Sequence, residues 1–222
     1  MKLLPKPPPT PKTSLKFEMS KFSIGQNSLD VLKVIVGDNP SVLFVKIISH
    51  KVGKNWRQVN FNNKLKIKNL EEGFEHPNPI KEKIYSRKDF LKLELGHLES
   101  KNKEQVWSFV SEVRCKNGIT CHIPMMNFHP EEVGMAEIVK AIKYICGKKR
   151  GCILDSGRFF HYYGNFLLNK NEWTKFLAQF LMACILVSPR YIGHRLHKGY
   201  CALRLTAQKD FKPKIPIVIK VL

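Results

Sequence analysis

Acidic side chains are scarce in this chain of 222 residues. Asp and Glu number 18 against 38 Lys and Arg, which leaves a formal net charge of +20. With so few carboxylates, most of the cationic side chains cannot find an internal partner of opposite charge. A field of this size attracts polyanions, so nucleic acid and anionic membrane surfaces are the partner classes that the composition favours.

Long apolar runs are also missing. No stretch approaches the roughly 18 to 20 residues that a membrane span needs, and the opening MKLLPKPPPTPK lacks the apolar core of a signal peptide. We therefore expect no membrane span and a cytoplasmic location, and of the two partner classes we expect nucleic acid and no membrane. At 43% apolar residues the chain still has enough to bury a core, so we expect it to fold.

The cysteines include no CxxC pair. Zinc sites and disulfide frameworks are recognised by regular spacings, whereas these cysteines fall mostly within apolar segments. Free thiols in such segments behave as small apolar side chains. We predict reduced thiols in the core at Cys115, Cys121, Cys146, Cys152, Cys184 and Cys201.

A cluster of basic and hydroxyl side chains lies between apolar segments in residues 151–207. Arginine presents a planar fork of donors that matches phosphate oxygens, and Gly157 lets the backbone approach a ligand. Alternatively, the arginines pair with buried carboxylates, of which Asp155, Glu172 and Asp210 lie nearby. Three carboxylates cannot pair with every cation, so the cluster favours a phosphate ligand. Its members are Asp155, Ser156, Arg158, His161, Arg190, His194, Arg195 and Arg204.

Composition divides the chain into three parts. Residues 1–13 are rich in proline and lysine and predict a flexible, solvated tail. Residues 14–105 form a basic N-terminal α+β part, in which residues 41–49 predict a strand. Residues 106–222 form the core of the protein.

Residues 52–88 are polar and rich in lysine, and they predict loops and short strands. Aromatic residues among lysines suit a surface for single-stranded nucleic acid, since bases stack on rings and lysines follow phosphates. The rings of Trp56, Phe61 and Phe74 would equally serve as anchors of a small core. Residues 89–98 fit helical and strand spacing alike.

The second half predicts alternating strands and helices. Strands at 106–113 and 119–126 form a β-hairpin around an Asn-Gly turn, and a helix follows over 131–146. This order indicates an α+β fold with a mixed or antiparallel sheet and helices on one face. The other predicted elements are strands at 151–155, 200–206 and 215–221, and a helix capped by Asn169 and Glu172 with the apolar face Trp173, Phe176, Leu177, Phe180, Leu181 and Cys184.

Two motifs in this half follow the pattern of a known family. The segment Ser156-Gly157-Arg158-Phe159-Phe160-His161 resembles the phosphate-binding motif of the archaeo-eukaryotic primase superfamily, closest to its small bacterial, primase 1D-like branch. Residues 190–196, RYIGHRL, together with residues 203–206, LRLT, resemble the region around that family's third motif. The resemblance covers about residues 106–222 and implies an RRM-like mixed sheet with helices packed on it.

The resemblance also implies a degenerate catalytic site. Asn127-Phe128-His129 stands where the family carries an acidic pair, and Ser188 stands where it carries a third acid. Two-metal phosphoryl transfer requires anionic oxygen ligands, which makes Asn127 and His129 a weakened first motif. Asp155 is either a substitute metal ligand or the cap of the turn that follows it.

Three functions fit these features. The first is a nucleic-acid- or nucleotide-binding protein with a primase-like fold and a degenerate polymerase site. The second is an active primase or primase-polymerase that uses Mg²⁺ or Mn²⁺ with NTPs or dNTPs. The third is a structural subunit, with a protein partner, in a larger replication, transposition or defence complex. In the first, phosphate is held by Ser156, Gly157, Arg158, His161, Arg190, His194 and Arg204.

Overall fold

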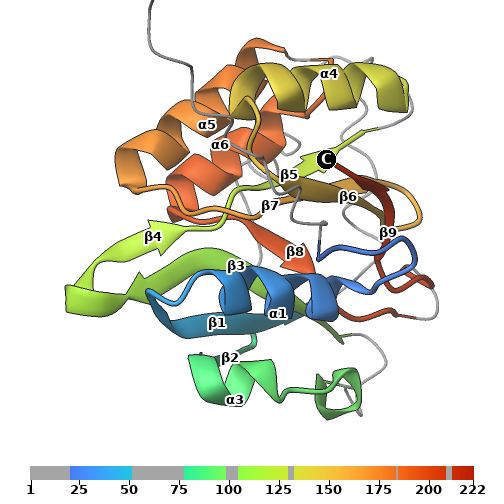
Figure 1. Cartoon of the computed structure of the whole chain (residues 1–222). Helices are drawn as coiled ribbons and strands as arrows, with labels where there is room; N and C mark the ends of the chain where they lie inside the picture. Colours follow the sequence, from blue (N-terminus) through green and yellow to red (C-terminus); the bar gives the residue numbers. More distant parts are fainter. Residues whose placement is uncertain (1–20, 52–77, 99–104, 130–132, 184, 209–211) are drawn as a thin grey trace, which may run out of the picture.

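The computed structural model of the chain describes residues 21–51, 78–98, 105–129, 133–183, 185–208 and 212–222. Two antiparallel sheets lie one above the other in Figure 1. The α-helices are α1 (Ser28–Asp38), α3 (Arg87–Leu91), α4 (Met135–Cys146), α5 (Lys170–Met182) and α6 (Pro189–Lys198). Short 3-10 turns are η2 (Leu95–Leu98) and η3 (Lys116–Gly118).

The five-stranded sheet joins distant parts of the chain. Its strands are β1 (Val42–Lys51), β2 (Lys81–Ser86), β3 (Gln105–Cys115), β4 (Thr120–His122) and β8 (Ala202–Arg204). The order is β2-β1-β3, and β3 then pairs with β4 near one end and with β8 further along. The sheet therefore uses strands from both sides of position 105, where the sequence suggested a boundary.

The four-stranded sheet has the order β5-β7-β6-β9. Its strands are β5 (Met125–Phe128), β6 (Gly151–Asp155), β7 (Phe160–Gly164) and β9 (Ile217–Val221). Since β7 lies between β5 and β6, the chain forms a split β-α-β unit around α4. Helices α4 and α5 cover the outer face of this sheet (Figure 1).

The predicted α+β class is confirmed, and every strand pairing in the described residues is antiparallel. The predicted strands at 41–49, 151–155, 200–206 and 215–221 correspond to β1, β6, β8 and β9. The predicted helix over 131–146 corresponds to α4, which begins at Met135 and ends before Gly147 at a φ of 64°. Residues 1–20 and 52–77, with the predicted tail and the Trp56, Phe61 and Phe74 surface, lie outside the described residues.

The predicted hairpin is correct in its first part and wrong in its second. Strand β4 pairs with β3, but β5 leaves this sheet and pairs with β7 in the other. The two strands are separated by Ile123 and Pro124. Because proline has no backbone N–H to donate to a ladder, the pairing ends there and the chain crosses between the sheets.

Helix α5 forms as its cap and apolar face predict. The Asn169 side chain accepts from the Glu172 N–H, and the Glu172 carboxylate accepts from the Asn169 N–H, a complete capping box. Trp173, Phe176, Leu177 and Phe180 are buried, whereas Leu181 is 38% exposed.

The five described cysteines are free, and all except Cys121 are buried. Within the described ranges, no helix has the length and apolar character needed to cross a bilayer.

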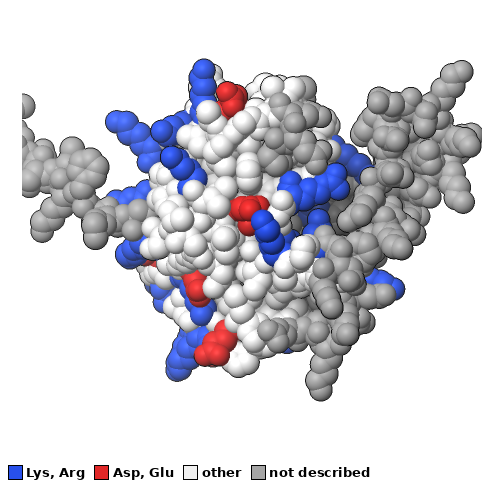
Figure 2. Space-filling view, turned by 90° about the vertical axis from the view of Figure 1, so that its right-hand side faces the viewer, with Lys and Arg blue, Asp and Glu red and all other residues white. Residues whose placement is uncertain are grey.

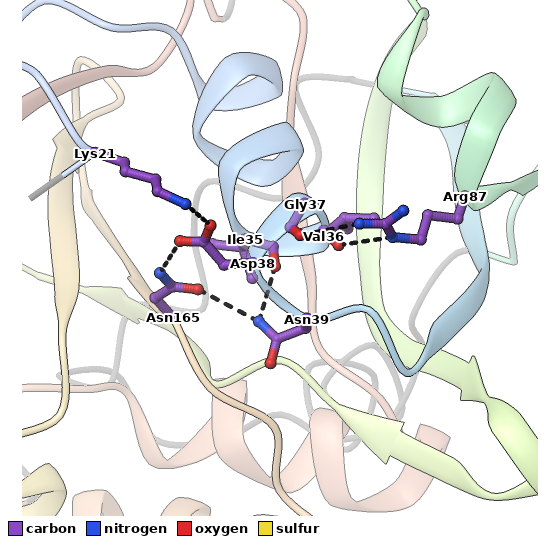
Figure 3. Close-up of polar contacts among 8 residues, drawn as sticks. All are labelled: Lys21, Ile35, Val36, Gly37, Asp38, Asn39, Arg87 and Asn165. Carbon is purple, nitrogen blue, oxygen red and sulfur yellow. Dashed lines mark hydrogen bonds and ion pairs between the residues drawn. The ribbon is translucent and has the colours of Figure 1, made fainter.

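A polar junction fastens the C-terminus of α1 to the residue that follows β7 (Figure 3). The Asn165 amide donates to the Asp38 carboxylate at 2.9 Å and accepts from the Asn39 amide at 3.3 Å. Lys21 also donates to Asp38, and the pKa of that carboxyl is lowered because these bonds outweigh the opposing effect of burial. Arg87 donates to the last carbonyls of α1, at Val36 and Gly37 (Figure 3).

This junction predicts that Asn165→Ala lowers the free energy of unfolding by about 1–3 kcal/mol, because Asp38 and Asn39 each lose a part-buried partner. Urea denaturation measures the effect. Asn171→Ala, at an exposed position of α5, is the matched control and should leave stability nearly unchanged. Equal stability of the two variants would contradict a fastening role for Asn165.

Candidate phosphate site between the two sheets

The register of the four-stranded sheet places Asn127 and His161 on the same face. Asn127 of β5 pairs directly with His161 of β7, which in turn pairs with Leu154 of β6. Their neighbours Phe128 and Phe160 face the other side, where the Phe128 ring meets the ring of Phe180 in α5 at 5.4 Å. Asn127 and His161 therefore face away from α5, toward β8 and the five-stranded sheet.

Both side chains hold buried polar atoms that lack a hydrogen-bond partner among the described residues. These atoms are Oδ1 of Asn127 and Nδ1 of His161, whose side chain is only 4% exposed. An unsatisfied buried polar atom costs about 1–3 kcal/mol. Two such atoms on directly opposed residues indicate a place for a polar ligand.

The surroundings of His161 carry positive charge. Burial lowers the pKa of His161 well below its usual value, and the charges of Arg204 and Lys212 lower it further. The imidazole is therefore neutral at pH 7 in the folded protein. An anion placed here would meet the cations that now oppose protonation of the ring.

The loop between β6 and β7 is held by its own side chains. The Asp155 carboxylate accepts from the Gly157 N–H at 2.6 Å, and the Ser156 hydroxyl donates to the Phe159 carbonyl at 2.7 Å. Gly157 has a φ of +97°, which a residue with a Cβ adopts only under strain. Asp155 and Ser156 thus shape the turn. Of the two roles predicted for Asp155, the contact with the Gly157 N–H is that of a cap of the turn.

Arg204 of β8 holds the same loop from the opposite sheet. Its guanidinium is buried and donates to three backbone carbonyls, those of Ser156, Thr206 and Lys214. Burial lowers the pKa of Arg204 to about 10, so the group stays charged at neutral pH. Its donors are used within the protein, and it acts on the site through its charge and by positioning the loop.

The described residues on this face do not fit a pair of divalent metal ions. Asp155 is the one carboxylate among the described strands of the four-stranded sheet, and it pairs with Phe160 on the face opposite to His161. Its second oxygen lies 3.6 Å from the Lys214 ammonium. Asn127 supplies a neutral oxygen, whereas Mg²⁺ and Mn²⁺ sites are built from carboxylates. Across the described ranges, no three His, Cys, Asp or Glu side chains gather as metal ligands.

A second cluster surrounds the Phe159 ring at the end of the loop. The Arg158 guanidinium lies 5.2 Å and the Lys212 ammonium 5.3 Å from the ring centroid, and the His129 ring lies at 4.5 Å. Cations near an aromatic ring are held by its quadrupole. The Phe159 ring therefore gathers Arg158, His129 and Lys212, and the charge of Lys212 also acts on His161.

Helix α6 carries the remaining predicted residues. Arg190 and His194 are half-buried and lie one turn apart on one face of this helix. The structure thus pairs Asn127 with His161, Arg204 with Ser156, and both His129 and Arg158 with Phe159. A role for Arg190 and His194 stays a prediction. Lys212 was missed, because no motif marks it and only its tertiary contacts place it beside His161 and Phe159.

Fold and site together describe an α+β protein whose two antiparallel sheets enclose a cationic site with few carboxylates. A family model described as archaeo-eukaryotic primase 1D-like matches residues 89–217, which is more than half of the chain. The chain belongs to this family, as the motifs around His161 predicted. No curated protein and no solved structure matches the chain.

The bonds of Arg204 predict that Arg204→Lys lowers the free energy of unfolding by about 2–3 kcal/mol, because lysine keeps the charge but cannot reach all three carbonyls. Thermal and urea denaturation measure this loss. Arg158→Lys is the control, since Arg158 is exposed, and its stability should match that of the wild type. Unchanged stability of Arg204→Lys would show that the buried guanidinium does not hold the loop.

The lowered pKa of His161 predicts a loss of stability in acid. The ring is neutral in the folded protein but binds a proton in the unfolded chain below about pH 6.5, so stability is complete above that pH and falls below it. In His161→Gln, the slope of unfolding free energy against pH between 6.5 and 5 should be smaller by up to about 1.4 kcal/mol per unit. Identical slopes in both proteins would contradict a buried neutral His161.

Proposed function

We propose that this protein binds the phosphates of single-stranded nucleic acid or of nucleotides between its two sheets, and that its polymerase chemistry is lost or reduced. One observation carries the proposal: the buried His161 ring holds an Nδ1 without a partner among the described residues, in a cationic field, on a sheet face without a described carboxylate. Such a site favours an anion and disfavours a metal pair.

The roles of the residues follow from their contacts. The His161 imidazole donates an N–H group to a phosphate oxygen, and the Asn127 side chain donates through its amide nitrogen, while its Oδ1 is an acceptor. Arg158 and Lys212, gathered around Phe159, supply charge beside them. Arg204 and Ser156 hold the loop in place. Because a bound phosphate anion favours the imidazolium form, binding opposes the lowering of the His161 pKa.

The charge of the whole chain supports a polyanionic ligand. Lysines and arginines exceed acidic residues by twenty, and basic side chains predominate on the face drawn in Figure 2. This charge gives a long-range attraction that weakens with salt, whereas the buried site gives the specific contact. A primase-like fold suits both, since members of the family are expected to handle nucleotides and nucleic acid.

The loss of polymerase chemistry follows from the ligand set. Two-metal phosphoryl transfer needs carboxylates that hold both ions, and Asn127 replaces one of them with a neutral amide. With Asp155 committed to Gly157 and Lys214, no described group on the His161 face takes over this role.

Binding is tested with a short fluorescein-labelled oligothymidylate, whose fluorescence anisotropy reports the affinity. His161→Gln should weaken binding by about 1–3 kcal/mol, or roughly 5- to 150-fold, because it removes a direct phosphate contact. His97→Gln, at an exposed position of η2, is the matched control and should bind like the wild type. Equal affinities of the two variants would contradict a phosphate site at His161.

Catalysis is tested by incubating the protein with a template strand, labelled nucleotides and Mn²⁺. We expect no template-dependent product above background. Clear product would show an active primase or primase-polymerase and would refute the loss of chemistry while leaving the phosphate site intact. Absence of nucleic-acid binding, together with stable co-purification of a partner protein, would instead favour the structural subunit.

A further inference from the structure

A small pocket lies between the five-stranded sheet and α6. Its volume is about 80 Å³, and its walls come from β1, from α6 and from the segment that leads into β8. The lining residues that matter are Ile48, His50, Arg195, Lys198, Tyr200 and Ala202.

Three of these side chains are basic, and none of the described lining residues is a carboxylate. Arg195 is only 7% exposed, with its guanidinium 5.0 Å from the centroid of the Tyr191 ring. Burial lowers the pKa of His50 to about 4, and the charges of Arg195 and Lys198 lower it further. His50 is therefore neutral at pH 7, and the cations are Arg195 and Lys198; burial and the charge of Arg195 both lower the pKa of Lys198. An anion between the two cations would offset their repulsion.

The volume of the pocket is suited to a small anion. Its volume is several times the roughly 10–15 Å³ that one water molecule requires, and well below the roughly 300–1,000 Å³ of sites for drug-sized ligands. A tetrahedral phosphate group fits such a space, whereas a base with its sugar does not. The Tyr200 hydroxyl adds a donor to the charged lining.

The pocket lies next to the site at His161. Ala202 lines the pocket, and Arg204 stands two residues further on the same face of β8, about 7 Å away along the strand. Ile48 lines it from β1 and shares a register row with Arg204, since both pair with Ser108 of β3. In addition, the charge of Lys212 lowers the pKa of both His50 and His161. The pocket and Arg204 thus share one face of the five-stranded sheet, and the charge of Lys212 reaches both histidines.

We propose that His50, Arg195 and Lys198 form a second phosphate subsite, which takes a further phosphate of the ligand held at His161. This inference rests on the proposed function and specifies its ligand: a molecule with at least two linked phosphates. An extended single strand and the phosphate chain of a nucleoside triphosphate both have this chemistry.

The test compares Lys198→Gln with Lys143→Gln, which makes the same charge change at an exposed position of α4. Affinity for the labelled oligothymidylate is measured at several salt concentrations. For Lys198→Gln we expect weaker binding and a salt slope that is smaller by about 0.7, the value for one phosphate contact on a single strand. Lys143→Gln should change neither.

A second variant blocks the pocket without changing charge. Ala202→Leu adds bulk to the pocket wall and should weaken binding several-fold while its melting temperature confirms that the protein is folded. Displacement of the labelled oligothymidylate by ATP then separates the two possible ligands. If ATP no longer displaces the oligonucleotide from either variant, the subsite binds the triphosphate chain. If ATP still displaces it from both variants, the subsite binds the backbone of the strand.

The outcomes separate this inference from the proposed function. If His161→Gln weakens binding but folded Lys198→Gln and Ala202→Leu bind like Lys143→Gln, the second subsite is refuted and the first stands. If the wild-type protein binds neither oligothymidylate nor ATP, both proposals are refuted.

Discussion

The structure depends on a buried positive charge between two sheets. Arg204 lies in the short strand β8 of one sheet and donates to the carbonyl of Ser156 in the β6–β7 loop of the other. Two further carbonyls, from Thr206 and Lys214, complete its hydrogen bonds. Charged groups are expensive to bury, and this one is retained without a carboxylate bonded to it in the described residues. The arrangement fixes the loop and leaves a positive field at His161.

The positive field at His161 accounts for the kind of ligand that the site suits. The neutral His161 ring, the opposed Asn127 amide and the cations around Phe159 form a set of donors and charges without acidic ligands on the same face. Such a set suits phosphate oxygens and does not suit a pair of metal ions. Membership of the archaeo-eukaryotic primase 1D-like family accounts for the primase-like fold, and the proposed loss of polymerase chemistry rests on Asn127 and on the orientation of Asp155.

Much of the second half could be predicted from sequence, because local signals there agree with the fold. The Asn169 cap, the apolar face of α5 and the apolar strand β6 required no knowledge of tertiary contacts. Helix α6 was not predicted, because its basic residues and Gly193 interrupt the helical spacing of apolar residues. Strand β7 was not predicted either, because its residues were interpreted as part of a phosphate-binding loop. The crossing at Pro124 depends on which sheet offers a partner, so the sequence alone could not reveal that Asn127 faces His161. Lys212 and His50 reach the site through contacts far apart in the chain.

A crystal structure of the protein soaked with a nucleoside triphosphate and Mn²⁺ tests the central claim most directly. We predict a phosphate oxygen at about 3 Å from the His161 imidazole and from the Asn127 amide, with no Mn²⁺ bound by side chains of that sheet face. Phosphates bound elsewhere on the surface, or a pair of Mn²⁺ ions held beside Asn127 and His161, would contradict the account.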